Sequence, residues 1–516
     1  MINLKGLMRD KMVLFFIGII IVGLIVRLFV FGVVTAGHSQ DDYWFISIAE
    51  NFIKTFKIEL LPGQPYDLSQ PLHPMLMGLT SLIFHDLYFN GKIFSLVMGF
   101  LSLPAVYFFW RKMEGVNVAL LATFFVAFSA LCLKFSVAVR EDSLYMLLLV
   151  LSLFFIYKMN ESPRKMVLAA IFISLSALTR WEGYLLIPVA LFSYVYSNKK
   201  RIFKKNEMDL GIFFNKYFLL AIIIVAVPLL FWSIRSYNLC DCGVLGLVPS
   251  YEYQKQLSGG GGGTGISFVT GLVDVIPWYF LIFMVGGLLL SLGDYRKYLP
   301  IYLYIALSFL IHMAFRGKPE QIVYIYPLLA GFMGICILKF KELFSKKNMK
   351  FFYILIVAFL VLFFVVEVNM GYSKTKSWGI RNEVIVDAVK WFDENVDHSE
   401  KLLVGDVVVY SYFTDRELIG ASYAGSWMYS YETTNKGLSD PIVPFVAFLF
   451  SNKINYAIAY DSTMSWFYDR TTTFAKGLSE KNYNFENGEI KLLPFKKFEK
   501  NGEEIIIYKL EVIQNK

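Results

Sequence analysis

The chain has 516 residues, of which 56% are hydrophobic and only 17% are charged, and its mean hydropathy is +0.53. A soluble globular protein carries about 25% charged residues, so the composition argues against a soluble enzyme and indicates a membrane protein. The net charge of +8 does not indicate nucleic-acid binding, because the basic residues gather in short connectors between apolar runs. Four cysteines are too few for a disulfide framework.

Apolar runs of membrane-spanning length alternate with short polar connectors up to residue 372. The runs cover residues 12–34, 92–110, 117–134, 142–158, 165–180, 182–197, 214–236, 269–292, 298–315, 321–339 and 350–371. Lysine and arginine mark every second connector, and the positive-inside rule assigns those connectors to the cytoplasm. We therefore expect a polytopic α-helical membrane protein with about eleven transmembrane helices, a retained first span and a cytoplasmic N-terminus.

An acidic pair, Asp41 and Asp42, follows the first span directly and is itself followed by Tyr43. Such a pair at a membrane surface is either an ordinary solvated loop element or a functional site, and its position alone leaves both interpretations open. The surrounding outer loop is expected to cover residues 35–91. Within it, the short apolar segment 72–88 contains His73 and suits an interfacial or re-entrant helix rather than a span.

Further cations lie at span ends on the expected outer face, against the positive-inside bias. Those cations, with their acidic neighbours, are Arg140-Glu141-Asp142, Arg180 with Glu182, Arg235, Arg316 and Lys318. Their partners are internal carboxylates, lipid headgroups or the phosphate of a membrane-embedded ligand. Arginine suits the last role because its planar fork matches phosphate oxygens, and a nearby carboxylate would serve as a general base.

A long outer loop at 237–268 contains five consecutive glycines, Gly259 to Gly263, and is expected to be flexible. It is either a slack linker or a mobile segment that orders over a substrate. After residue 372 the pattern changes to an amphipathic helix at 380–397 and short β-rich runs at 401–410, 454–460, 488–493 and 503–512. We expect a transmembrane domain at 1–372 and, after one linker, an extracytoplasmic α/β domain at 373–516.

Several short motifs resemble the GT-C-fold glycosyltransferases, most closely the protein O-mannosyltransferase and aminoarabinose-transferase group. The motifs that carry the resemblance are Asp41-Asp42-Tyr43, Pro71-Leu72-His73-Pro74, Ala138-Val139-Arg140-Glu141-Asp142, Leu178-Thr179-Arg180-Trp181-Glu182-Gly183 and the turn from Arg316 to Pro327. Two of them depart from the family pattern, with Met75 and Trp181 in place of proline. The resemblance covers residues 10–370.

The resemblance implies an inverting transfer of a sugar from a polyprenyl-phosphate or dolichyl-phosphate donor to an acceptor outside the cytoplasm. Asp41 or Asp42 would deprotonate the acceptor, which is a protein, a lipid or a glycan. The residues expected to bind the donor phosphate or the substrate are Tyr43, His73, Arg140, Glu141, Arg180, Arg235, Arg316 and Lys318. No cofactor is required, no metal-ligand set is assigned, and a divalent cation is left open.

Three alternatives remain. An oligosaccharyltransferase-like GT-C enzyme would transfer a whole glycan to asparagine with a metal, but the closest string to its Trp-Trp-Asp-Tyr-Gly motif is Ser426 to Tyr431, without the Trp pair or the Asp. A lipid-linked sugar flippase would show internal repeats and mid-membrane breaks. The third is a membrane scaffold whose soluble domain binds a partner. The sequence names neither the sugar nor the acceptor.

Overall fold

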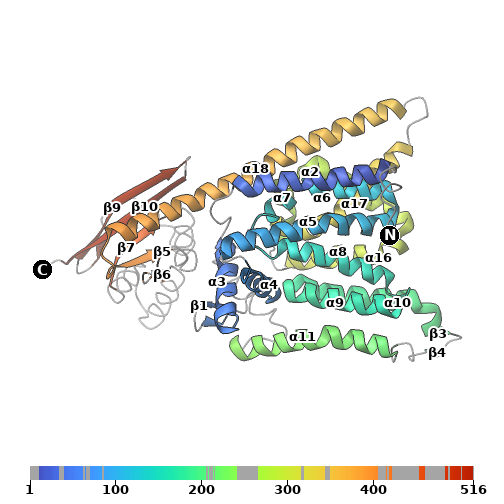
Figure 1. The fold of residues 1–516 in the computed structure, drawn as a ribbon, viewed down its shortest axis with the longest axis horizontal. Coiled ribbons are helices and arrows are strands. Elements are labelled where there is room, and N and C mark those ends of the chain that lie inside the picture. Colours follow the sequence, from blue (N-terminus) through green and yellow to red (C-terminus); the bar gives the residue numbers. More distant parts are fainter. Residues whose placement is uncertain are drawn as a thin grey trace. The chain divides into compact units, whose positions relative to one another are not determined.

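A computed structural model describes most of the chain (Figure 1). The described residues are 11–33, 40–61, 64–65, 70–83, 86–204, 207–208, 213, 215–240, 265–314, 319–342, 349–404, 414, 416, 418–420, 453–459, 483–485, 488–500 and 503–514. They fall into two compact units. The first contains residues 11–33, 48–240 and 265–375, and the second contains residues 40–47 and 376–514, and each is described by itself.

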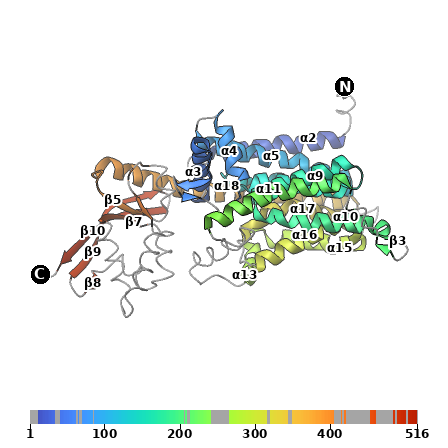
Figure 2. The ribbon, with the colours of Figure 1, turned by 90° about the horizontal axis from the view of Figure 1, so that it is seen from below.

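The first unit is a bundle of apolar helices that lie side by side (Figures 1 and 2). Its helices are α2 (Lys11–Val33), the second half of α3 (Gln40–Thr55), α4 (Leu72–Ser81), α5 (Leu87–Glu114), α6 (Val116–Phe128), α7 (Ala130–Phe135), α8 (Asp142–Lys158), α9 (Pro163–Thr179), η1 (Trp181–Leu185), α10 (Leu186–Ile202), α11 (Lys216–Cys240), α13 (Gly265–Thr270), α14 (Leu272–Val275), α15 (Trp278–Leu290), η3 (Ser291–Asp294), α16 (Tyr295–Ala314), η4 (Pro319–Tyr324), α17 (Tyr326–Glu342) and the first part of α18 (Met349–Asn395). All eleven expected apolar runs are helical, and five helical segments among the described residues are long and apolar enough to cross a membrane by length and composition.

The core of the bundle lies between α5, α6, α8 and α17. The indole Nε1 of Trp110, on α5, donates a hydrogen bond to the carbonyl oxygen of Pro327 at a distance of 3.0 Å. Gly331 lies against the same ring, and a Cβ atom there would come within 1.8 Å of it. This close approach explains why α17 has a glycine at a position that faces a buried tryptophan.

Three of the expected runs, 117–134, 269–292 and 321–339, are interrupted, the last by a turn between η4 and α17, so these runs are not single helices. The run 117–134 divides into α6 and α7 at Ser129, whose backbone is extended. The run 269–292 divides into α13, α14 and α15, with Pro277 directly before α15. The break at Ser129 is relevant to the site, because α7 leads into the segment that carries Arg140.

The expected first outer loop contains regular structure. It holds α3, a small hairpin of β1 (Glu59–Leu61) and β2 (Gln64–Pro65), and α4. A helix of ten residues is about 15 Å long, too short to cross a bilayer, and this agrees with an interfacial or re-entrant α4. The next helix, α5, begins at Leu87 instead of 92 because the side chain of Asp86 caps it, accepting a hydrogen bond from the Phe89 amide at 2.9 Å.

The second unit contains a six-stranded mixed sheet in the order β6-β5-β7-β10-β9-β8. The strands are β5 (Lys401–Val404), β6 (Leu418–Gly420), β7 (Ile454–Ala459), β8 (Tyr483–Phe485), β9 (Gly488–Lys500) and β10 (Glu503–Gln514), while β3 (Phe203–Lys204) and β4 (Glu207–Met208) form a separate hairpin in the first unit. The strand β5 pairs in parallel with β6 and β7, and the other pairs are antiparallel. All four expected β runs contain a strand.

The amphipathic helix expected at 380–397 is the last part of α18 rather than a separate element after a linker. Its expected apolar face is buried: Val384, Ile385, Ala388, Val389 and Phe392. Arg416 closes the end of this helix with hydrogen bonds to the carbonyl oxygens of Asp393 and Asp397, at 3.1 and 2.6 Å, and an ion pair to the Asp393 carboxylate. The units divide at residues 375/376, within α18, three residues beyond the expected boundary at 372/373.

Two expectations fall on residues outside the described ranges. One is the flexible loop with Gly259 to Gly263; of the expected loop 237–268, residues 237–240 end α11 and residues 265–268 begin α13. The other is the string from Ser426 to Tyr431 in the second unit.

Candidate active site

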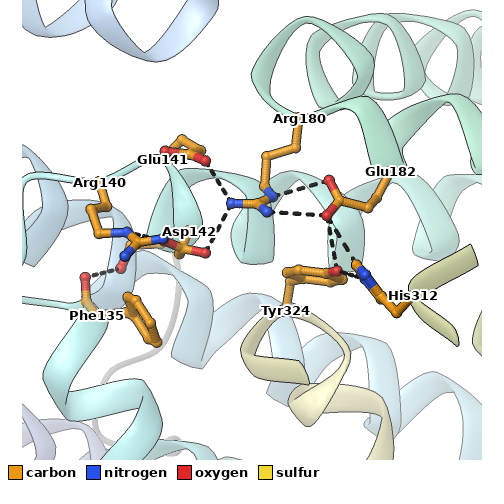
Figure 3. Close-up of polar contacts among 9 residues, drawn as sticks. Phe135, Arg140, Glu141, Asp142, Arg180, Glu182, His312 and Tyr324 are labelled. Atoms are coloured by element: carbon orange, nitrogen blue, oxygen red, sulfur yellow. Dashed lines mark hydrogen bonds and ion pairs between the residues drawn. The ribbon is translucent and has the colours of Figure 1, made fainter. Parts of the chain in front are cut away.

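Charged side chains from distant parts of the sequence converge where α7, α8, α9 and η4 end or begin (Figure 3). They come from the connector between α7 and α8, from the turn between α9 and η1, and from η4 with the end of α16. We call the set Arg140, Glu141, Asp142, Arg180 and Glu182 the ionic cluster. It joins two motifs that lie 40 residues apart in the sequence, a convergence that the sequence suggested only as a shared face.

Arg180 is the centre of the ionic cluster, and its side chain is only 6% exposed. Its Nε and Nη2 atoms form a two-pronged pair with the carboxylate of Glu182, at 3.1 and 3.0 Å. Its Nη1 atom donates to Glu141 at 2.6 Å and to Asp142 at 3.1 Å. Charge-assisted and bidentate hydrogen bonds of this kind are the strong ones, so Arg180 is held in one orientation.

Local backbone geometry brings these groups together. Gly183 packs so tightly on the end of α9 that a Cβ atom there would lie 2.4 Å from the backbone of Ser176 and Ala177, which explains the glycine after Glu182. On the other side, the Ser143 hydroxyl donates to the carbonyl oxygen of Phe135 at 2.8 Å and ties the start of α8 to the end of α7. The turn that carries Arg180 and the connector that carries Arg140 are therefore both fixed.

Arg140 occupies a different environment from Arg180, because 16% of its side chain is exposed. Its Nε atom pairs with Asp142 at 3.0 Å, and its guanidinium lies 5.1 Å from the centre of the Phe135 ring. The pair with Asp142 is the internal salt bridge that the sequence offered as one of the partners for Arg140. A partly exposed guanidinium held beside the Asp142 carboxylate and the Phe135 ring is suited to receive an anionic ligand.

A second buried cation, Lys134 on α7, lies beside Phe135. Its Nζ atom pairs with Glu320 of η4 at 2.8 Å and lies 5.3 Å from the centre of the Phe135 ring. The Lys134 side chain is 4% exposed, whereas that of Glu320 is 36% exposed. Sequence analysis did not single out Lys134, because a lysine inside an apolar run looks like a span-end residue until its partner from η4 is known.

A hydrogen-bond chain continues from Glu182 to two residues that sequence analysis also did not single out. The Tyr324 hydroxyl donates to Glu182 at 3.0 Å and is hydrogen-bonded to Nε2 of His312, which lies 3.8 Å from the Glu182 carboxylate. Tyr324 lies within the turn from Arg316 to Pro327, so its motif was recognised but its role was not. His312 offers no signal in the sequence, because it ends an apolar helix.

Three carboxylates face two guanidinium groups, and the pKa values of two of them, Glu141 and Glu182, are shifted in opposite directions. Burial raises the pKa of Glu141 to about 7, and its ion pair with Arg180 only partly offsets this. Burial acts in the same direction on Glu182, but the two-pronged pair with Arg180 outweighs it and lowers the pKa of Glu182. The second oxygen of Glu141, Oε2, is buried and accepts no hydrogen bond from the described residues. Of these two glutamates, Glu141 therefore binds a proton more readily.

His73, on α4, is fully buried, and its ring meets Phe94 edge-on at 5.6 Å between ring centres. Burial lowers the pKa of His73 to about 3, with smaller opposing effects from Asp142 and Arg140. The ring is therefore neutral at physiological pH. It lies within electrostatic range of Asp142 and Arg140.

The remaining cations that the sequence pointed to are not part of the ionic cluster as described. Arg235, half-buried on α11, donates to the carbonyl oxygen of Ile58 at 2.8 Å and lies 4.5 Å from the ring centre of Trp232. The hydrogen bond holds α11 against the residue that precedes β1. Arg316 and Lys318 lie outside the described residues.

Asp41, Asp42 and Tyr43 belong to the second unit and occupy the start of α3. Asp42 is fully buried, Asp41 is partly exposed and Tyr43 is 2% exposed. Two carboxylates in the first turn of a helix are favoured by its dipole. A fully buried aspartate is nevertheless not an ordinary solvated loop residue, which was the plainer of the two interpretations of this pair.

No group of three or more histidine, cysteine, aspartate or glutamate side chains within the described ranges has the arrangement of a metal site. Cys132 and Cys336 are buried free thiols.

Comparison with known proteins finds one family model that matches part of the sequence and several solved structures with a similar fold. The family model of dolichyl-phosphate-mannose-protein mannosyltransferases matches residues 64–232, which include the whole ionic cluster. No curated protein sequence matches the chain at a significant level. The fold is similar to that of ArnT from Cupriavidus metallidurans, in a structure bound to undecaprenyl phosphate, with 12% identity, a TM-score of 0.59 and coverage of 96% of this chain and 97% of that one.

The fold is also similar to that of the oligosaccharyltransferase of Archaeoglobus fulgidus in its apo form. The identity is 12%, the TM-score is 0.57, and the match covers 89% of this chain and 71% of the other. The two likenesses show a shared fold, and they confirm the GT-C architecture and the multi-pass membrane protein that the motifs and the apolar runs predicted.

Proposed function

We propose that this chain, a membrane glycosyltransferase of the GT-C fold, transfers a sugar from a polyprenyl-phosphate donor to an acceptor on the extracytoplasmic face, with inversion at the anomeric carbon. The observation that carries the proposal is the ionic cluster. It unites the two motifs around Arg140 and Arg180, and it lies within the segment that matches the mannosyltransferase family model.

The reaction needs a base, a leaving group and a means of stabilising that group. Asp42 or Asp41 would accept the proton of the acceptor hydroxyl, whose oxygen then forms a bond to the anomeric carbon. The bond from that carbon to the donor phosphate oxygen breaks, and the electron pair leaves with the polyprenyl phosphate. In-line attack from the opposite side of the sugar inverts the anomeric configuration. The proton on the aspartate is afterwards lost to water.

The two arginines of the ionic cluster take different roles in this proposal. Arg140, partly exposed and bound to one carboxylate, would stabilise the negative charge on the departing phosphate. Arg180 makes four hydrogen bonds to carboxylates and is 6% exposed, which supports a positioning role behind Arg140 rather than direct contact with the donor. Asp142 connects them, because it accepts from both.

Two structural relatives support a lipid-phosphate donor. The Cupriavidus metallidurans structure contains undecaprenyl phosphate, and a structure of AglB from Archaeoglobus fulgidus, similar to this chain at a TM-score of 0.53 and 12% identity, contains dolichol-phosphate and an inhibitory peptide. These ligands share a phosphate on a polyprenyl chain. The acceptor class and the sugar are left open by this proposal, and no cofactor is included in it.

The test is a transfer assay with the purified full-length protein in nanodiscs. Radiolabelled polyprenyl-phosphate mannose and polyprenyl-phosphate aminoarabinose serve as donors, with peptide, glycolipid and glycan acceptors. Loss of a general base lowers a rate by about 10²- to 10⁴-fold. We therefore expect the transfer rate of the Asp41→Asn or the Asp42→Asn variant to fall by this factor. Asp387→Asn, an equivalent change at an exposed site of α18, is the matched control.

Full transfer by both variants would contradict the assignment of the base. No transfer by the wild-type protein from any polyprenyl-phosphate sugar would contradict the proposed reaction itself. A melting curve for each variant separates a lost base from a lost fold, because Asp42 is buried.

A second candidate function is favoured by the likeness to the Archaeoglobus fulgidus oligosaccharyltransferase. In that case the chain would transfer a lipid-linked oligosaccharide to an asparagine side chain with the help of a divalent cation. An asparagine-containing acceptor peptide and a chelator distinguish the two. Transfer that survives the chelator and ignores asparagine favours the first function.

A further inference from the structure

An apolar groove lies between α5 and α8, near the C-terminal ends of both helices. Its volume is about 460 Å³, and its walls include Ala105, Phe108, Phe154 and Phe155. Phe108 is 51% exposed, and this agrees with a groove that opens toward lipid. None of these residues belongs to the ionic cluster, which lies at the start of α8 rather than at its end.

Three cations line the same groove: Arg111, Lys112 and Lys158. They occupy the last turns of α5 and α8. The Lys158 Nζ atom lies 4.1 Å from the ring centre of Phe154, and the Arg111 guanidinium lies 5.9 Å from that of Tyr107. Phe154, which holds Lys158, is part of the groove wall, whereas Tyr107 is buried beside it.

The positive charge of the groove is mostly uncompensated. Within the described ranges, Arg111 and Lys158 form no ion pair with a carboxylate. Lys112 pairs with Glu161 at 3.5 Å, but Glu161 also pairs with Lys165, and an ion pair this exposed contributes little. Basic residues at helix C-termini are favoured by the helix dipole and by the positive-inside rule, which accounts for their presence but not for a groove between them.

We propose that this groove binds one anionic phospholipid of the surrounding membrane. An acyl chain would lie against Phe108, Phe154 and Phe155, and the phosphodiester and its anionic headgroup would be bound by the three cations. The pairing of an apolar, lipid-facing groove with a basic end is the arrangement by which membrane proteins select acidic lipids. By the charge pattern of the connectors, the lipid belongs to the cytoplasmic leaflet.

The test measures lipid binding to the delipidated full-length protein by native mass spectrometry. Dioleoyl-phosphatidylglycerol is compared with dioleoyl-phosphatidylcholine at equal concentration. Each cation near such a headgroup contributes about a fivefold change in affinity, so the triple variant Arg111→Gln, Lys112→Gln and Lys158→Gln should bind phosphatidylglycerol roughly a hundredfold more weakly. Ala105→Trp should also weaken binding, because it fills the groove without changing the charge.

A matched control removes the same charge elsewhere. The control variant combines Lys339→Gln, Lys341→Gln and Lys350→Gln, at the end of α17 and the start of α18. Its affinity for phosphatidylglycerol should stay within about twofold of the wild-type value. An equal loss of affinity in this control variant would mean that the overall positive charge attracts phosphatidylglycerol, and it would overturn the proposed site. Equal affinity for the two lipids would overturn it as well.

Two further outcomes are decisive. Unchanged binding in the triple variant, shown by its melting curve to be folded, would overturn the proposal. Competitive displacement of phosphatidylglycerol by polyprenyl phosphate would assign the groove to the donor lipid instead. If the triple variant does not fold, Lys158→Gln and Ala105→Trp provide the same comparison one change at a time.

Discussion

Arg180 illustrates how a buried charge becomes a structural element. Desolvating a guanidinium and three carboxylates is costly, and the cost is offset only if nearly every polar atom finds a partner. Arg180 meets this condition through Glu141, Asp142 and Glu182, and it thereby holds the start of α8 against η1. Removing Arg180 would leave Glu141 and Glu182 buried without the guanidinium that pairs with both, which is the expensive situation.

We predict that Arg180→Lys destabilises the protein by about 3 kcal/mol, because an ammonium group cannot form the fork with Glu182 and still reach Glu141. Arg140→Lys should change stability by less than about 1 kcal/mol, since its ion pair is partly solvated. Thermal unfolding in one detergent measures both. Equal melting temperatures for the two variants would show that Arg180 has no special structural role.

In the transfer assay we expect the opposite order, with the larger effect on donor binding in Arg140→Lys. Arg140→Lys should raise the KM for the donor, because a point charge replaces a guanidinium that matches phosphate bidentately. A rate loss in Arg180→Lys that disappears when the temperature is lowered would identify it as a positioning residue.

Glu141 gives the ionic cluster a pH dependence. Its pKa is about 7 in the folded protein against an ordinary value of 4.5, so between these values the folded state binds more protons than the unfolded state. Stability therefore falls as pH rises through this interval, and the cost is fully present above pH 7.

We accordingly expect Glu141→Gln to remove this cost. The unfolding free energy of the variant minus that of the wild type should increase steadily from pH 5 to about pH 8 and then level off. Chemical denaturation at a series of pH values measures this difference. A difference that does not vary with pH would mean that Glu141 is ionised throughout.

At the scale of the helices, side chains from α2 and α18 stabilise the break between α6 and α7. Arg27, fully buried in α2, donates to the carbonyl oxygens of Ala127 at 2.7 Å and Val126 at 3.3 Å, near the end of α6. Glu367, on α18, accepts a hydrogen bond from the Ala130 amide at 2.7 Å, at the start of α7. Backbone groups freed by a helix break in an apolar bundle must be satisfied, and these two side chains supply the partners.

We predict that Glu367→Leu destabilises the protein by about 1 to 3 kcal/mol, because the Ala130 amide loses its acceptor in a buried site. The transfer rate should also fall, since α7 carries Lys134 and leads to Arg140. Glu367→Gln retains an acceptor oxygen and should recover most of both properties. Melting curves and transfer rates of the two variants provide the comparison, and equal behaviour would remove the capping role.

At the scale of the whole molecule, the two units are joined by one continuous helix, α18. One linker was expected after residue 372, but the helix continues to Asn395, and its last part packs on the sheet of the second unit. Residues 40–47, which carry Asp41 and Asp42, also belong to the second unit. The proposed base therefore lies in a different unit from the ionic cluster.

The connector charges predict a cytoplasmic N-terminus and an extracytoplasmic second unit. In right-side-out membrane vesicles, external protease should remove an epitope tag at the C-terminus and leave one at the N-terminus. Inverted vesicles should give the opposite result. Cleavage of both tags on the same side would contradict the assigned orientation and place the proposed acceptor in the wrong compartment.

Composition, apolar run length and connector charge were enough to predict a multi-pass helical membrane protein, and the change of pattern after residue 372 predicted a separate α/β region. The GT-C resemblance came from short motifs. These features are local or additive along the chain, so they survive without knowledge of distant contacts. The motif around Arg180 was recognised in the same way. The helix breaks at Ser129 and Pro277 were not predicted, because an apolar run reads alike whether or not it is continuous.

The partners of the charges needed the tertiary structure. Nothing in the local sequence separates Arg180, enclosed by three carboxylates, from Arg140, which keeps an exposed edge. Lys134, His312 and Tyr324 join the site only because η4 and the end of α16 pack beside α7 and α8. Burial and ion pairing in the site depend on groups that lie up to 186 residues apart, and folding alone decides which of them meet.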